Sequence, residues 1–103
     1  MRLEFTGEII EWRGPAPFLF IRTPDWVTEE IKSVSRRVTY GWGCITVTLL
    51  VGKTTVKTAL FPREGAYMVP IKMAVQKAEN VSLGDTVSLS LELEISAASL
   101  GVQ

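Results

Sequence analysis

The sequence contains no histidine and a single cysteine, Cys44, among its 103 residues. Without histidine, the commonest general base is missing, and so are the Ser-His-Asp triad and every metal site built on an imidazole ligand. One cysteine can form neither an internal disulfide nor a cysteine metal cluster, and it fits a reducing compartment. These absences favour a cytoplasmic, non-catalytic protein without a metal ion or another cofactor.

Long apolar runs and net charge are also missing. No apolar stretch approaches the ~18 residues that a membrane-spanning helix needs, and the N-terminus lacks the apolar core of a signal peptide. Eleven basic residues balance eleven acidic ones. Overall charge therefore draws the protein to neither anionic lipid nor nucleic acid, although a local basic patch stays open. We expect no membrane association.

What is present is an ordinary globular composition, with 47% hydrophobic and 21% charged residues. A chain of this length is typical of one domain with one core. Alternating or helical periodicity extends to residue 95 and is absent afterwards. We predict a single β-barrel domain over residues 1–95 and a loose C-terminal tail over residues 96–103.

The first two predicted strands carry turn residues between them. Leu3 to Arg13 alternates apolar and polar positions, which predicts a strand. Gly7 interrupts its apolar side and indicates a bulge or a close backbone approach. A turn over residues 14–17 contains two prolines. Phe18 to Thr23 is apolar on both sides, which predicts a buried strand that pairs back on the first.

The middle of the chain predicts a hairpin. Two β-branched segments, residues 44–50 and 55–61, flank Gly52-Lys53, and this glycine-first pair indicates a type II′ turn. A break at residues 62–65 precedes a short strand that ends at Pro70. The turn over residues 82–85 leads into a last strand from Thr86 to Ile95, whose strict alternation indicates antiparallel pairing.

Two helices are predicted. The first begins at Thr23-Pro24 and has one apolar stripe, formed by Val27, Ile31 and Val34. The second begins at Pro70 and also has one apolar face, formed by Ile71, Ala74, Val75 and Ala78. Asn80 suits the left-handed position that ends a helix. Residues 39–43 are predicted as a loop.

About six strands and two one-sided helices favour a mainly β barrel whose open ends are covered by helices. Five segments in register then resemble a known family: residues 41–45, 57–62, 67–72, 75–79 and 83–87. The chain is similar over nearly its whole length to the domain-of-unknown-function family DUF1905. The sequence departs from that pattern at Ala59, where serine is frequent, and at Asn80, where glycine is frequent.

The resemblance implies a fold and no reaction. The family is expected to form a double-split β-barrel, a six-stranded pseudobarrel capped at both ends by two short α-helices. This barrel is distantly similar to AbrB-type and MazE-type DNA-binding barrels.

Candidate site residues come from basic and aromatic side chains. Lys57, Arg63 and Lys72 are predicted near the hairpin, the loop after it and the start of the second helix, where an anion is favoured. Trp42 and Tyr67 would add stacking surfaces for bases. The alternative is that the basic residues only solvate the exterior while the aromatic residues cover the core.

The function therefore stays unknown at the level of sequence. The first hypothesis is a small non-catalytic binding domain for nucleic acid or an anionic ligand. The second is a protein-interaction or self-assembly module, based on exposed strand edges and the loop around Tyr40 and Trp42. Whether the chain is a monomer or a homodimer is open.

Overall fold

The computed structural model describes residues 1–14, 18–40 and 44–93, and more of them lie in strands than in helices. The strands are β1 (Arg2–Glu8), β2 (Ile10–Trp12), β3 (Phe18–Arg22), β4 (Thr39–Tyr40), β5 (Cys44–Val51), β6 (Thr54–Arg63), β7 (Ala66–Pro70) and β8 (Thr86–Leu93). The helices are α1 (Asp25–Val38) and α2 (Met73–Glu79). The prediction of a mainly β chain with two short helices is confirmed.

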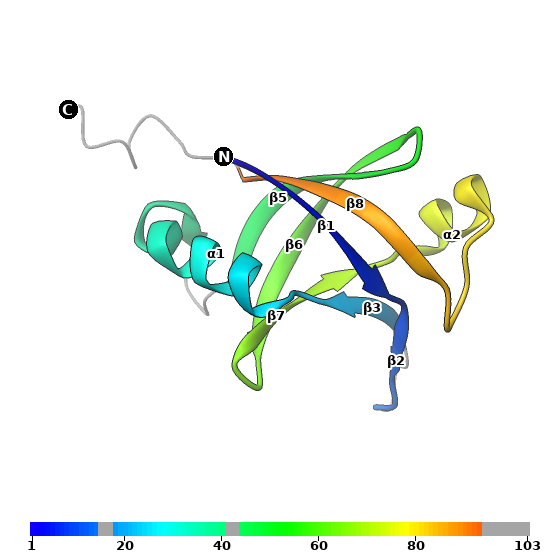
Figure 1. Cartoon of the computed structure of the whole chain (residues 1–103), viewed down its shortest axis with the longest axis horizontal. Helices are drawn as coiled ribbons and strands as arrows, with labels where there is room; N and C mark the ends of the chain where they lie inside the picture. Colours follow the sequence, from blue (N-terminus) through cyan, green and yellow to red (C-terminus); the bar gives the residue numbers. More distant parts are fainter. Residues whose placement is uncertain (15–17, 41–43, 94–103) are drawn as a thin grey trace.

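The strands form one curled antiparallel sheet (Figure 1). Seven of them follow in the order β1-β8-β5-β6-β7-β3-β2, and the two-residue β4 pairs with β5 beside this path. β1 and β2 stand at opposite ends of the order, yet only Ile9 separates them along the chain. The sheet therefore curls far enough for one residue to join its two end strands.

The sheet has two halves that share β6. The first half contains β1, β8, β5 and the part of β6 that pairs with β5, up to Leu60. The second half contains the rest of β6, from Phe61, together with β7, β3 and β2. Since β6 changes partner within its own length, the two halves enclose a common interior.

The predicted strand from Leu3 to Arg13 is interrupted at Ile9. The Ile9 amide donates to the Asp85 carbonyl at 2.8 Å, and the Ile9 carbonyl accepts from the Gly84 amide at 2.9 Å. These bonds attach Ile9 to the turn before β8. After Ile9 the chain no longer pairs with β8, and β2 pairs with β3. This pairing agrees with the prediction that Phe18–Thr23 pairs back on the first strand.

Gly7 allows the two halves to approach each other. A side chain at this position would overlap Cγ2 of Ile21 in β3, and Ile21 is fully buried. Glycine removes that overlap, because it has no Cβ. Of the two alternatives predicted for Gly7, the structure has the close approach, made by the Ile21 side chain, while the pairing with β8 runs through Gly7 without a bulge.

Both hairpins around β6 turn on residues with positive φ. Gly52 has φ 59°, whereas Lys53 is not among the described residues with positive φ. Positive φ at the first central residue alone is typical of the predicted type II′ turn. Glu64 and Gly65 have φ 50° and 81°, the pattern of a type I′ turn. The predicted break at residues 62–65 is therefore shorter, since β6 continues to Arg63.

Helix α1 begins just after Thr23-Pro24, as predicted, and its apolar stripe is buried in the core. The Thr23 hydroxyl accepts the Tyr67 amide at 3.0 Å and shares a hydrogen bond with the Thr28 hydroxyl at 2.7 Å. This buried threonine thus fastens the start of α1 to β7.

Helix α2 begins three residues later than predicted, because Pro70 is the last residue of β7 and pairs with Phe20. Its predicted apolar face is wrong in part, since Ala74 and Ala78 are exposed and Val75 is the buried residue of the helix. Ile71, also buried, precedes the helix. The prediction for Asn80 is confirmed, with φ 53° and ψ 48°.

Two polar contacts hold α2 against β6. The Glu79 carboxylate accepts the Lys53 amide at 3.2 Å and the Thr54 hydroxyl. The Lys72 ammonium donates to the Lys57 carbonyl at 3.3 Å. The helix is thus attached near both of its ends along one strand.

The core fills the interior of the curled sheet. The helices lie toward opposite ends of its long axis (Figure 1), and buried residues of both join the same hydrophobic cluster as the inward side chains of β1, β3, β5, β6, β7 and β8. The predicted inward positions of the last strand are buried at Leu89, Leu91 and Leu93.

Some predictions are corrected or not covered. Thr39 and Tyr40 form β4 and pair with the start of β5, whereas the sequence predicted a loop. The proline part of the turn at residues 14–17, the extension of the last strand to Ile95 and the tail over residues 96–103 lie outside the described residues.

Candidate functional site

The outward side of the first half is polar. Residues directly opposite each other on paired strands point to the same side of a sheet. Leu91 pairs with Leu3 on one neighbouring strand and with Leu49 on the other, and all three side chains point inward. The residues directly before and after them along each strand therefore point outward. We call these outward residues the hydroxyl surface: Thr6, Thr46, Thr48, Thr55, Ser88 and Ser90, with Arg2, Glu4, Lys57 and Glu92 among them.

The outward side of the second half is aromatic. Ile21↔Val69 points inward to the core, so Phe20 and its paired neighbours point outward. We call the following outward residues the aromatic surface: Ile10, Trp12, Phe18, Phe20, Phe61 and Met68, with Arg22 and Arg63 at the rim. Phe20 and Met68 are buried although they lie outside the main core cluster.

The aromatic rings of this surface pack on one another. Phe18 lies 6.4 Å from Trp12, 5.8 Å from Phe20 and 6.1 Å from Phe61 between ring centroids, with interplanar angles of 36–54°. Such tilted pairs at this spacing are favourable contacts. The surface is therefore a second, smaller apolar cluster on the outside of the sheet.

Trp12 is held from two sides. The Arg63 guanidinium carbon lies 3.5 Å from the centroid of its ring, a cation–π contact. The backbone of Gly14 lies against its Nε1, where any Cβ would overlap the indole. The indole is thus fixed in place beside the rim.

A cavity of about 260 Å³ opens on this surface. Its lining residues are Ile10, Trp12, Phe20, Arg22, Arg63, Glu64 and Met68. Arg22 donates to the Glu64 carbonyl at 2.6 Å and lies 3.9 Å from its carboxylate. Arg63 forms no ion pair with any residue in the described ranges. The cavity therefore has an apolar floor and one guanidinium at its mouth without an acidic partner.

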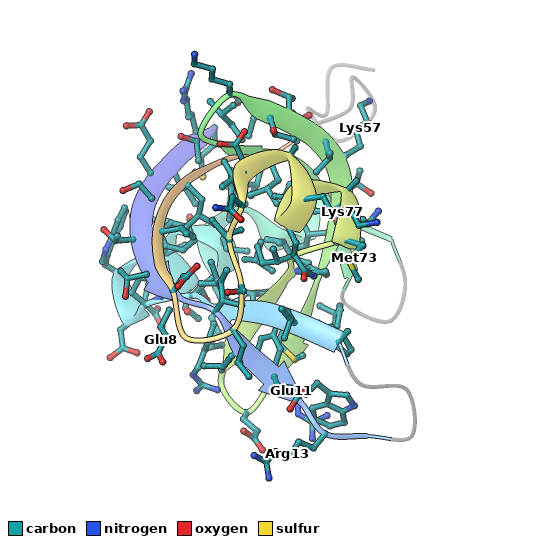
Figure 2. All side chains as sticks on the ribbon, turned by 90° about the vertical axis from the view of Figure 1, so that its right-hand side faces the viewer. Glu8, Glu11, Arg13, Lys57, Met73 and Lys77 are labelled. Carbon is teal, nitrogen blue, oxygen red and sulfur yellow. The ribbon has the colours of Figure 1, made fainter. Side chains whose placement is uncertain are left out.

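Two of the sequence-predicted basic residues come together. The Lys72 ammonium donates to the Lys57 carbonyl at 3.3 Å, so the Lys72 side chain reaches the backbone of Lys57. Figure 2, which looks onto α2, shows Lys57 on the same side of the view as Met73 and Lys77 of that helix but set apart from them. Both predicted lysines are exposed.

The other three predicted residues do not join them. Arg63 is six residues beyond Lys57 on β6, up to about 20 Å along an extended strand, and it contacts Trp12 instead. Tyr67 is 7% exposed and belongs to the core, so it lacks the open ring face that base stacking requires. Burial raises the pKa of its phenol. Trp42 lies outside the described residues.

Sequence reasoning missed the aromatic surface. The available signal was residues 18–21, which are apolar on both sides of the strand. That pattern was interpreted as double-sided burial. In the structure Ile21 faces the core, whereas Phe18 and Phe20 face outward. Trp12, which lies in the first predicted strand, also lines a surface cavity.

Comparison with known proteins gives a family and no activity. In the part of the chain that the structure covers, none of the helices combines the length and the apolar character needed to cross a membrane. No curated protein matches the sequence. The model of one family, described as a domain of unknown function (DUF1905), matches residues 5–91. That match covers most of the sequence, and the chain therefore belongs to the DUF1905 family.

Proposed function

We propose that this domain is a non-catalytic binding module that recognises another protein through the aromatic surface. The observation that carries this proposal is an apolar cluster on the outside of a sheet whose inside already forms the core. Trp, Phe, Met and Arg are the residue types enriched in protein interfaces, and Trp and Arg are frequent among residues that dominate binding energy.

Three features of the surface favour a protein over a nucleic acid. The rings are tilted against one another and do not form the open platform on which bases stack. Arg63 occupies a face of Trp12. Glu64 lies beside Arg22, and Glu11 lies 3.9 Å from Arg13. These carboxylates offset the positive charge that phosphates would require.

The experiment compares affinity capture by the wild type with capture by two surface variants, Phe61→Ser and Arg63→Glu. The matched control is Thr48→Ala on the hydroxyl surface. We expect one specific partner to be lost with both aromatic-surface variants and kept with the control. Retention of every partner by all four folded proteins, with circular dichroism as the folding check, contradicts the proposal.

A second candidate follows from the neighbouring Lys57 and Lys72. Their proximity supports weak binding of nucleic acid or another anionic ligand beside α2. Titration with DNA and RNA at two salt concentrations tests it, because phosphate contacts weaken steeply as salt rises. Lack of binding at low salt, or binding that ignores salt, rules this candidate out.

We further propose that the fold is the six-stranded double-split barrel that the family resemblance implies, with a helix over each open end. Taking β1 and β2 as one strand bent at Ile9, and setting aside the two-residue β4, leaves six strands. Inward and outward positions alternate without a break through Ile9, which supports this count. The lone cysteine supports a cytoplasmic location.

A further inference from the structure

The cavity on the aromatic surface has the size of a single side chain. Its volume is about 260 Å³, whereas sites for drug-sized ligands span about 300–1,000 Å³ and an apolar cavity of about 150 Å³ holds benzene. Ile10, Phe20 and Met68 form an apolar floor. The space is larger than benzene needs and smaller than a drug-sized site, and one phenylalanine side chain fits within it.

The mouth of the cavity has a cation that no described residue pairs with. Arg22 is engaged by Glu64 through its carbonyl and its carboxylate. The guanidinium carbon of Arg63 instead lies 3.5 Å from the centroid of the Trp12 ring, a distance at which two planar groups stack. Stacking of that kind leaves the N–H edge of the guanidinium available for a bidentate carboxylate.

The neighbouring charges favour a carboxylate over a phosphate. Glu64 lines the same cavity, and its side chain is 73% exposed. A phosphate carries up to two charges and would meet stronger repulsion from this carboxylate than a singly charged group would. Arg22 and Arg63 with Glu64 leave one net positive charge at the cavity, which suits a single negative charge.

The open area favours a short segment over a second folded copy. Large apolar side chains bury roughly 150–250 Å² each, and those of the aromatic surface are already buried or half-buried. The remaining open area is well below the ~800 Å² per partner of a standard interface.

We infer that this cavity binds a short acidic segment of a partner protein, with one large apolar side chain inside and an adjacent Asp or Glu carboxylate on Arg63. This inference rests on the proposed function and specifies the chemistry of the partner.

The test uses three acetylated, amidated peptides of about nine residues. One has a phenylalanine flanked by glutamates, the second has glutamines in their place, and the third has alanine in place of the phenylalanine. Each is titrated to millimolar concentration into the ¹⁵N-labelled full chain. The reporter is the indole N–H signal of Trp12, assigned with Trp12→Phe.

We expect the glutamate peptide to shift the Trp12 signal and to bind roughly twofold to fivefold more tightly than the glutamine peptide, the usual effect of one exposed ion pair. The alanine peptide should cause no shift. Arg63→Gln should remove the preference for glutamate, Arg63→Lys should reduce it, and Arg2→Gln on the hydroxyl surface should leave it unchanged.

Equal binding of the glutamate and glutamine peptides overturns the acidic preference and leaves the proposed function in place. A Trp12 shift with inorganic phosphate or a single-stranded oligonucleotide, and with no peptide, also overturns the inference. Absence of any shift overturns it as well, and the capture experiment then decides the proposed function separately.

Discussion

The two halves of the sheet have similar inner sides and very different outer sides. In both halves the inward positions carry branched aliphatic residues, as in Leu91 of the first and Ile21 of the second. Outward, the first half presents serines, threonines and paired charges, while the second presents Trp12, three phenylalanines and a methionine.

This difference separates what the fold requires from what it does not. A sheet with one solvated side needs polar residues there, and the hydroxyl surface meets that requirement. The aromatic surface breaks this pattern by placing large apolar side chains on the outside of the sheet, and such a departure from local rules usually marks a functional region.

The largest expected change in the free energy of unfolding comes from substitutions in the core that the two halves share. Ile21→Ala and Leu91→Ala each remove a fully buried side chain from a different half. We expect each to lower the free energy of unfolding by about 2–5 kcal/mol. Urea unfolding followed by tryptophan fluorescence and by circular dichroism should give a single, coincident transition. Two separate transitions would mean that the halves fold independently.

The next effect tests the junction between the halves. Gly7→Ala forces a Cβ into Ile21, and overpacking of this kind costs about 1–3 kcal/mol. The control Thr6→Ala, one residue away on the hydroxyl surface, should change stability by less than about 0.5 kcal/mol. Equal stability of both variants in urea would contradict the observed contact between β1 and β3.

A smaller effect concerns the attachment of α2 to the first half. Glu79→Ala removes the acceptor of the Lys53 amide and the Thr54 hydroxyl and should cost about 1–2 kcal/mol. Glu29→Ala breaks only an exposed pair with Lys32 and should cost less than about 0.5 kcal/mol. Hydrogen exchange at the Lys53 amide should rise in the first variant alone. Unchanged exchange there would contradict the attachment.

The substitution with the smallest expected effect on stability at neutral pH is at Tyr67, in the second half. Its pKa lies above the ordinary value of 10.0 because the phenol is buried. The folded state therefore keeps this proton where the unfolded state releases it, and the free energy of unfolding falls as pH rises above about 10. Tyr67→Phe should match the wild type at pH 7 and lose less stability at pH 11. Parallel pH profiles of the two proteins would refute this.

Sequence patterns predicted the first half better than the second. Alternation in residues 86–93 and the Gly52-Lys53 turn are local signals, and both gave the correct strands. In the second half Pro70 was correctly predicted to end a short strand, but it was also interpreted as the helix start, since proline is common there. It belongs only to β7, where it pairs with Phe20 of β3, and α2 begins at Met73.

The candidate site was harder to predict than the fold. Lys57 and Lys72 are adjacent as the hypothesis needed, but Arg63 is separate from them and Tyr67 is buried. Periodicity identifies which residues share a side of a strand. It does not say which side faces the interior when both are apolar, and this ambiguity concealed Phe18 and Phe20.

The attachment of α2 has a consequence for protein handling. Within the described ranges, residues 54–60 of β6 pair with β5 along one edge, and Glu79 and Lys72 attach α2 to the same segment. An unpaired strand edge is a template to which strands of other chains can add, and this addition can lead to fibrils. Because α2 lies against this segment, it hinders the addition of further chains. A variant that weakens the attachment, such as Glu79→Ala, should therefore aggregate on storage under conditions in which it is still folded.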